Sequence, residues 1–142
     1  MKRLTVLFLV PLAAIALAAL PAVAKPLCLN SGSLNLFLKK VATKKGRFGP
    51  IDGVSIGGGS SRRPLTGAYA VAPDGGLVSI SLSIGSVSVS SDGAATIGSN
   101  RSFYELRWDP DEDMASGRFI SIGLSTDSDP VTLDVVDCKD VL

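Results

Sequence analysis

The chain has 142 residues, of which 46% are hydrophobic and 19% are charged, and its formal net charge is +1. This length suits one domain with a single core, and a charge so close to zero predicts no general affinity for nucleic acid. The sequence contains no histidine, which excludes Ser-His and Cys-His catalytic triads and metal sites built on imidazole.

Residues 1–24 have the features of a cleavable secretory signal. Two basic residues precede an apolar stretch from Leu4 to Leu20, and the sequence Ala-Val-Ala at 22–24 provides the small residues that a signal peptidase accepts. Pro11 lies within the apolar stretch and Pro21 directly follows it, and together with the Ala-Val-Ala end they argue against a permanent membrane anchor. We therefore expect residues 25–142 to form one secreted or periplasmic domain of a bacterium, with no stable membrane insertion.

A basic segment follows early in this domain. Its members are Lys39, Lys40, Lys44, Lys45 and Arg47, and Phe48 directly follows Arg47. Residues 25–63 hold eight basic residues and one acidic residue, whereas residues 64–142 hold four basic and twelve acidic residues. Either the two halves neutralise each other, or the basic segment binds an anionic surface polymer with an affinity that decreases as salt increases.

Apolar and polar residues alternate with a period of two over most of the domain, and this pattern predicts β-strands. The expected strands are Leu34–Leu38, Ile51–Ile56, Leu65–Val71, Leu77–Ser90, Phe103–Trp108, Phe119–Ser125 and Val131–Val135. No amphipathic helix pattern follows the leader, although residues 39–46 are long enough for a helical turn. We expect an all-β fold, either a small antiparallel sandwich or a small barrel.

The segment from Leu77 to Ser90 has the clearest alternation. Aliphatic residues from Val78 to Ile84 form one face, and serines form the other. From Val78 to Ile84 the aliphatic residues stand at even-numbered positions, and after Gly85 they stand at odd-numbered positions. This change predicts either a bulge or a turn between two strands.

An acidic segment at 109–113 separates two of the expected strands. Asp109, Asp111 and Asp113 match the opening of a calcium-binding loop. Met114 stands where such a loop requires glycine, and Ile120 stands where it requires the bidentate glutamate. The pattern favours a solvated acidic turn, with calcium binding as the alternative.

Cys28 and Cys138 are the two cysteines of the chain. In an oxidising compartment they predict a disulfide, with α-carbons about 5–6 Å apart. Such a bond makes the first and last elements neighbours and favours a closed architecture. Two buried free thiols are the alternative.

The sequence places no two carboxylates as a glycosidase requires, and the glycines at 57–59 lack the Gly-Lys-Ser/Thr of a phosphate-binding loop. We therefore expect a non-enzymatic exported domain without a cofactor, which binds an anionic polymer or another exported protein. A self-assembling structural component of the cell surface is the first alternative, and a calcium-dependent hydrolase is the second.

Overall fold

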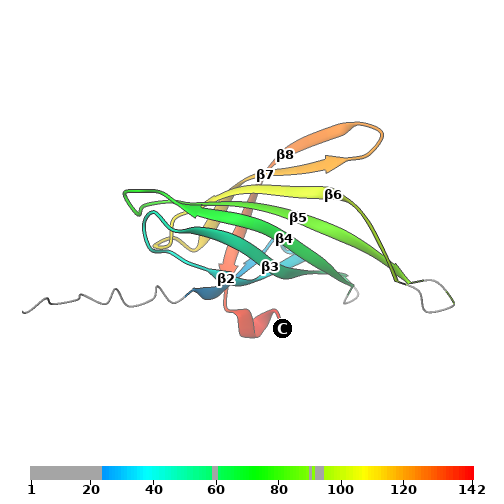
Figure 1. Cartoon of the computed structure of the whole chain (residues 1–142), viewed down its shortest axis with the longest axis horizontal. Coiled ribbons are helices and arrows are strands. Elements are labelled where there is room, and N and C mark those ends of the chain that lie inside the picture. Colours follow the sequence, from blue (N-terminus) through cyan, green and yellow to red (C-terminus); the bar gives the residue numbers. More distant parts are fainter. Residues whose placement is uncertain (1–23, 59–60, 90, 92–94) are drawn as a thin grey trace, which may run out of the picture.

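The computed structural model describes residues 24–58, 61–89, 91 and 95–142, so nearly all of the expected leader lies outside the described residues. The described chain forms one closed antiparallel barrel in which each strand pairs with its neighbour in sequence and β8 pairs with β1 (Figure 1). Its strands are β1 (Lys25–Asn30), β2 (Leu34–Val41), β3 (Phe48–Gly57), β4 (Arg62–Val71), β5 (Val78–Val89), β6 (Ala95–Trp108), β7 (Met114–Ile122) and β8 (Thr126–Val136). The expected all-β fold is confirmed, and of the two expected architectures the barrel is correct.

The structure differs from the sequence interpretation in the bounds of several strands, β6 and β8 among them, and in three further details. β1 was not expected, because a strand of six residues that contains Pro26 shows little alternation. The segment 39–46 forms no helical turn: β2 continues to Val41, and hydrogen-bonded turns follow. The strand expected at Phe119–Ser125 runs instead from Met114 to Ile122, because its inward residues are the small Ala115 and Gly117 rather than a recognisable aliphatic series.

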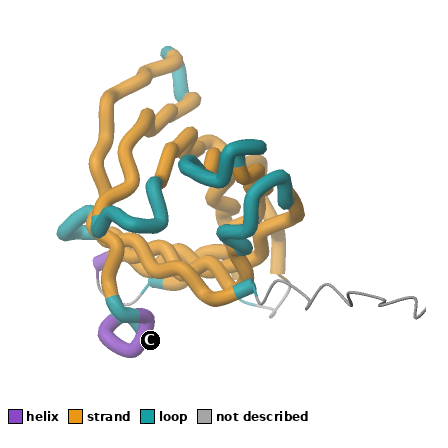
Figure 2. The backbone as a smooth tube through the Cα atoms, turned by 90° about the vertical axis from the view of Figure 1, so that its left-hand side faces the viewer, coloured by secondary structure: helices purple, strands orange, loops and turns teal. Residues whose placement is uncertain are grey.

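The connections between strands lie at the two ends of the barrel. The connections 42–47, 72–77 and 109–113 lie together at one end, on the left in Figure 1, which we call the packed end. The connections between β1 and β2, β3 and β4, and β7 and β8 lie at the other end, which we call the mouth end. Figure 2 looks at the packed end and shows the β7–β8 hairpin projecting away from the ring of strands.

Strand alternation fills the barrel interior. In β5, Val78, Ile80 and Leu82 are at most 2% exposed, whereas Ser79 and Ser81 face outward. The register between β5 and β6 shifts between Ile84 and Ser86 within one continuous strand, so of the two predictions for Gly85 the bulge is correct. Other inward residues complete a single core: Leu27, Leu29, Leu36, Leu38, Val41, Ile51, Leu65, Val71, Ile84, Tyr104, Leu106, Trp108, Ala115 and Leu133.

A continuous row of buried residues closes the packed end. The cross-strand register places Val71 beside Val78, Val78 beside Trp108, and Trp108 beside Ala115. Each of these side chains is at most 9% exposed. The indole N–H of Trp108 donates a hydrogen bond of 3.1 Å to the carbonyl oxygen of Glu112 in the following connection. The indole is therefore packed and satisfied, as a buried tryptophan requires.

The predicted disulfide is confirmed. Cys28 and Cys138 are bonded, and their α-carbons lie 5.2 Å apart, within the expected range. Cys28 lies between the inward-facing Leu27 and Leu29 and is nevertheless only 1% exposed. The 3₁₀ helix η2 (Cys138–Asp140), which follows β8, contacts β1 at this point. The bond therefore joins β1 to the helix that follows β8, and β1 and β8 are the strands that close the barrel.

None of the helical structure in the described part of the chain has the length and apolarity of a membrane-spanning helix.

Candidate functional site

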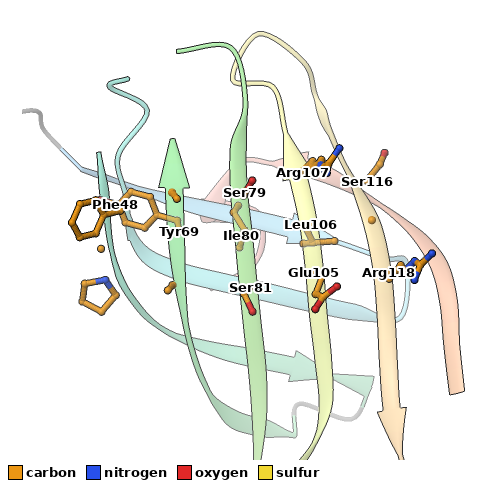
Figure 3. Close-up of a pocket in the computed structure, with 15 residues that line it drawn as sticks. Phe48, Tyr69, Ser79, Ile80, Ser81, Glu105, Leu106, Arg107, Ser116 and Arg118 are labelled. Carbon is orange, nitrogen blue, oxygen red and sulfur yellow. The ribbon is translucent and has the colours of Figure 1, made fainter. Parts of the chain in front are cut away.

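A broad hollow lies on the outer face of the barrel and crosses five neighbouring strands, β3 to β7 (Figure 3). Its volume is about 1320 Å³. The cross-strand register arranges its outward-facing residues in two rows. The first row is Phe48, Ala70, Ser79, Arg107 and Ser116, and the second is Pro50, Ala68, Ser81, Glu105 and Arg118. We call this feature the outer hollow.

The outward-facing side chains at the centre of the hollow, Ala68, Ala70, Ser79 and Ser81, are small and leave space above the strands. A Cβ atom on Gly67 would lie 2.0 Å from the carbonyl oxygen of Ser81, and one on Gly117 would lie 1.9 Å from that of Glu105. No side chain fits at such distances, so glycine is required where these strands approach each other. Ile80 and Leu106, each 2% exposed, form the apolar layer beneath the floor.

The two sides of the outer hollow differ in chemistry. Phe48 stands at one side with 81% of its surface exposed. Arg107 and Arg118 stand at the other side, together with Glu105, which the register places opposite Arg118 (Figure 3). An aromatic ring, guanidinium groups and the serine hydroxyls between them allow stacking, ion pairing and hydrogen bonding on one surface.

The basic segment lies beside this surface, with Lys39 and Lys40 at the end of β2 and the other three residues in the connection that leads into β3. All five of its cationic residues are exposed. The N–H of Gly46 donates to the carbonyl of Ala72 (3.3 Å), and the N–H of Val71 donates to the carbonyl of Arg47 (2.7 Å). These bonds hold the segment against the β4–β5 connection. Because Phe48 follows Arg47 directly, the basic segment continues into the outer hollow.

The acidic segment at 109–113 forms a tight turn at the same end of the barrel. The carboxylate of Asp109 accepts the N–H of Asp111 (3.0 Å), and its carbonyl accepts the N–H of Glu112 (2.9 Å). The carboxylate and the carbonyl of Asp109 thus both accept hydrogen bonds within the turn. Across the residues placed in the structure, no three acidic or cysteine side chains converge to hold a metal ion, so the calcium alternative rests on the sequence pattern alone.

The strand order places the acidic turn and the basic segment on opposite sides of the packed end, with the β4–β5 connection between them along one side. Within the described ranges, no ion pair joins the two segments. The two segments therefore do not pair directly, whereas neutralisation between the larger halves 25–63 and 64–142 stays a prediction.

A second, smaller cavity of about 330 Å³ lies inside the barrel at the mouth end, and we call it the mouth cavity. Its polar lining includes Ser55, Arg63 and Tyr104, and the Tyr104 ring lies 4.9 Å from that of Phe119. Burial raises the pKa of the Tyr104 phenol above its ordinary value of 10.0. These residues were not singled out as a site from the sequence, although Ser55 and Arg63 occupy inward positions of their strands.

Comparison of the chain with protein-family models, with curated proteins and with solved structures finds no match.

Proposed function

We propose that this protein is an exported, non-enzymatic binding module that takes an acidic polysaccharide across its outer hollow. The observation that carries the proposal is the placement of an exposed Phe48 and two arginines, Arg107 and Arg118, on opposite sides of one hollow. The disulfide and the expected secretory leader agree with a site of action outside the cytoplasm.

Each part of the hollow has a task in this proposal. The ring of Phe48, which is 81% exposed, stacks on the face of a sugar ring. The guanidinium groups of Arg107 and Arg118 each pair with a carboxylate or sulfate through two parallel hydrogen bonds. Ser79 and Ser81, which lie between them, exchange hydrogen bonds with sugar hydroxyls.

The basic segment increases the rate and affinity of this binding without specifying the sugar. Its exposed cations attract a polyanion over roughly a Debye length, about 8 Å at physiological salt. A polymer that lies in the outer hollow and continues past Phe48 reaches Arg47 next. A linear polyanion contacts the outer hollow and the basic segment at once, whereas a small anion contacts only one of them.

The test is retention of the full-length secreted protein on immobilised heparin, followed over a range of salt concentrations. We expect salt-dependent retention that decreases markedly in the R107Q/R118Q double variant. The matched control is K25Q/K139Q, which removes the same number of positive charges outside the hollow. Absence of retention at low ionic strength, or equal losses in the two double variants, would overturn the proposal.

The substitution F48S tests whether Phe48 is a stacking platform or only an exposed side chain. The substitution leaves the net charge unchanged, so an electrostatic surface alone predicts no change in retention. The proposal predicts weaker binding by roughly 1–3 kcal/mol, the range found when an aromatic platform for a nucleobase is removed.

Self-assembly is the second candidate function, and the edge of β8 favours it. β1 pairs only with Asp134, Val135 and Val136, so the longer part of β8, from Thr126 to Leu133, has no β1 partner in the described structure. A free edge of this kind pairs with other chains unless it is protected. Pro130 and two aspartates, Asp127 and Asp129, provide such protection here, and for this reason we rank self-assembly second. Sedimentation at high protein concentration tests it, and a strict monomer excludes it.

A further inference from the structure

We propose that the mouth cavity is a separate binding site for a small amphipathic carboxylate, with its anionic head at Arg63 and its apolar body inside the barrel. This site is distinct from the outer hollow: it lies on the inner face of the wall and opens at the mouth end. The inference therefore does not depend on the polysaccharide proposal.

The parity of β4 places Arg63 on the inner face. Leu65, two residues further along the strand, is only 1% exposed and belongs to the core. The register places Arg63 beside Ser55, which is 2% exposed, and places the neighbouring Arg62 beside Ile56. Arg63 lines the cavity and Arg62 does not. Two adjacent arginines thus have opposite environments on the same strand.

The lining of the mouth cavity is divided between apolar and hydroxyl groups. Leu34, Ile84 and the Phe119 ring supply apolar surface. Hydrogen-bonding groups come from four hydroxyl residues, namely Ser55, Ser61, Ser102 and Tyr104. Arg63 is the one charged residue among the described residues of the lining. A ligand that matches this lining has one negative charge at the mouth and an apolar remainder.

A carboxylate is stable in such a place only with a cation and further hydrogen-bond donors, because burial of an unpaired charge is costly. Arg63 supplies the cation, and because the residue is exposed, it remains in contact with water at the mouth. Tyr104, at 5% exposure, supplies a phenol, which is able to donate a hydrogen bond.

The size of the cavity restricts the ligand further. A volume of about 330 Å³ lies at the lower limit of ordinary ligand pockets, which span roughly 300–1,000 Å³. Below it, Leu36, Leu65 and Leu82 are at most 1% exposed, so the interior has no space for a long chain. The fit is to a medium-chain fatty acid or a compound of that size, and a two-chain lipid is too large.

The experiment titrates sodium octanoate into the full-length secreted protein, with affinity measured by calorimetry and the position of binding measured by NMR shifts of Tyr104 and Phe119. The uncharged 1-octanol is the matched ligand control. We expect saturable octanoate binding at these residues. R63Q should lower the affinity for octanoate about tenfold or more, as expected for loss of a charged hydrogen bond. R62Q, with the same change of charge one residue away, should leave it within about twofold of the wild type.

The result that overturns the inference is octanoate binding that does not shift Tyr104 and Phe119, or equal losses in R62Q and R63Q, which would indicate only a surface charge effect. Equal affinity for octanoate and octanol would also overturn it, because Arg63 would then have no task. A thermal melt of R63Q checks folding, and R63K, which keeps the charge but loses the planar fork, should fall between R63Q and the wild type. Heparin retention of R63Q should match that of R62Q, so this inference and the proposed function fail independently.

Discussion

The two ends of the barrel differ in how their interiors are used. At the packed end, a row of buried apolar residues that includes Val71, Val78 and Trp108 fills the interior, and the Cys28–Cys138 bond joins β1 to η2. At the mouth end, the corresponding inward positions carry hydroxyl groups and the cationic Arg63 around a cavity. The same strands, with the same alternation, thus form a core at one end and a polar cavity at the other.

Within the barrel interior, close packing and ligand-sized space are thus separated along the barrel axis, whereas the outer hollow lies on the outer face beside the packed end. Binding sites occur preferentially where a rigid scaffold holds groups that add little to its own stability. The β7–β8 hairpin agrees with this division: its packed-end part belongs to the wall, whereas its tip projects from the ring and carries the fully exposed Leu124 (Figure 2). The predictions that follow test whether stability is concentrated at the packed end.

Removal of the disulfide should have the largest effect. C28A/C138A opens a loop of 110 residues, and the chain-entropy model gives a loss of roughly 4–5 kcal/mol in the free energy of unfolding. Urea unfolding of the variant, compared with the oxidised wild type, measures this. A loss below about 1 kcal/mol would contradict a packed end that depends on the bond between β1 and η2.

Truncation of one aromatic residue at each end compares the two regions directly. W108A removes a side chain that is 9% exposed and hydrogen-bonded, and should cost about 3–5 kcal/mol. F119A removes a half-buried ring beside the mouth cavity and should cost less than half as much, because the site already has access to solvent. Equal losses, measured by chemical denaturation, would show that the mouth end is as important for stability as the packed end.

The same division explains what the sequence could predict. The strong alternation in β5 and the pair of cysteines identify the all-β fold and the bond between its ends, because both depend on short-range periodicity or on residue type. The outer hollow could not be predicted, since it arises where the register brings Phe48, Ser79 and Arg107 into one row across four strands. Register across several strands is a property of the whole sheet and leaves no local pattern.

The sequence contains a pattern that indicates the mouth cavity, but the pattern is ambiguous. Ser55 and Arg63 are polar residues at positions whose parity faces inward, a departure from ordinary strand patterning that marks a functional or solvated interior. In the sequence alone, Arg63 beside Arg62 belongs equally well to a basic loop. The strand boundary at Arg62 decides between the two interpretations, and strand boundaries are poorly specified by short-range periodicity.

The phenol of Tyr104 should make the mouth end sensitive to alkaline pH. Burial raises its pKa in the folded state above 10.0, so the unfolded chain loses this proton first as the pH rises. The contribution of the protonated phenol to the free energy of unfolding is complete below about pH 10, and it is lost as the pH rises through the raised folded-state pKa. In a Y69F background, where Tyr104 is the remaining tyrosine, tyrosinate absorbance should appear at a higher pH in the folded protein than in the urea-unfolded protein. Coincident titrations would mean that water reaches the phenol freely.

The smallest effect is expected at the acidic turn, which belongs to the packed end but lies in solvent. D109A removes the acceptor for the Asp111 N–H and should cost about 0.5–1 kcal/mol. D113A removes the same charge from the turn without that hydrogen bond, so it should change the melting temperature less than D109A. Calcium provides the opposing outcome: if the ion raised the melting temperature of the wild type and both variants lost that increase, the carboxylates would be metal ligands. The turn would then be a second binding region at the end of the barrel that we assign to stability.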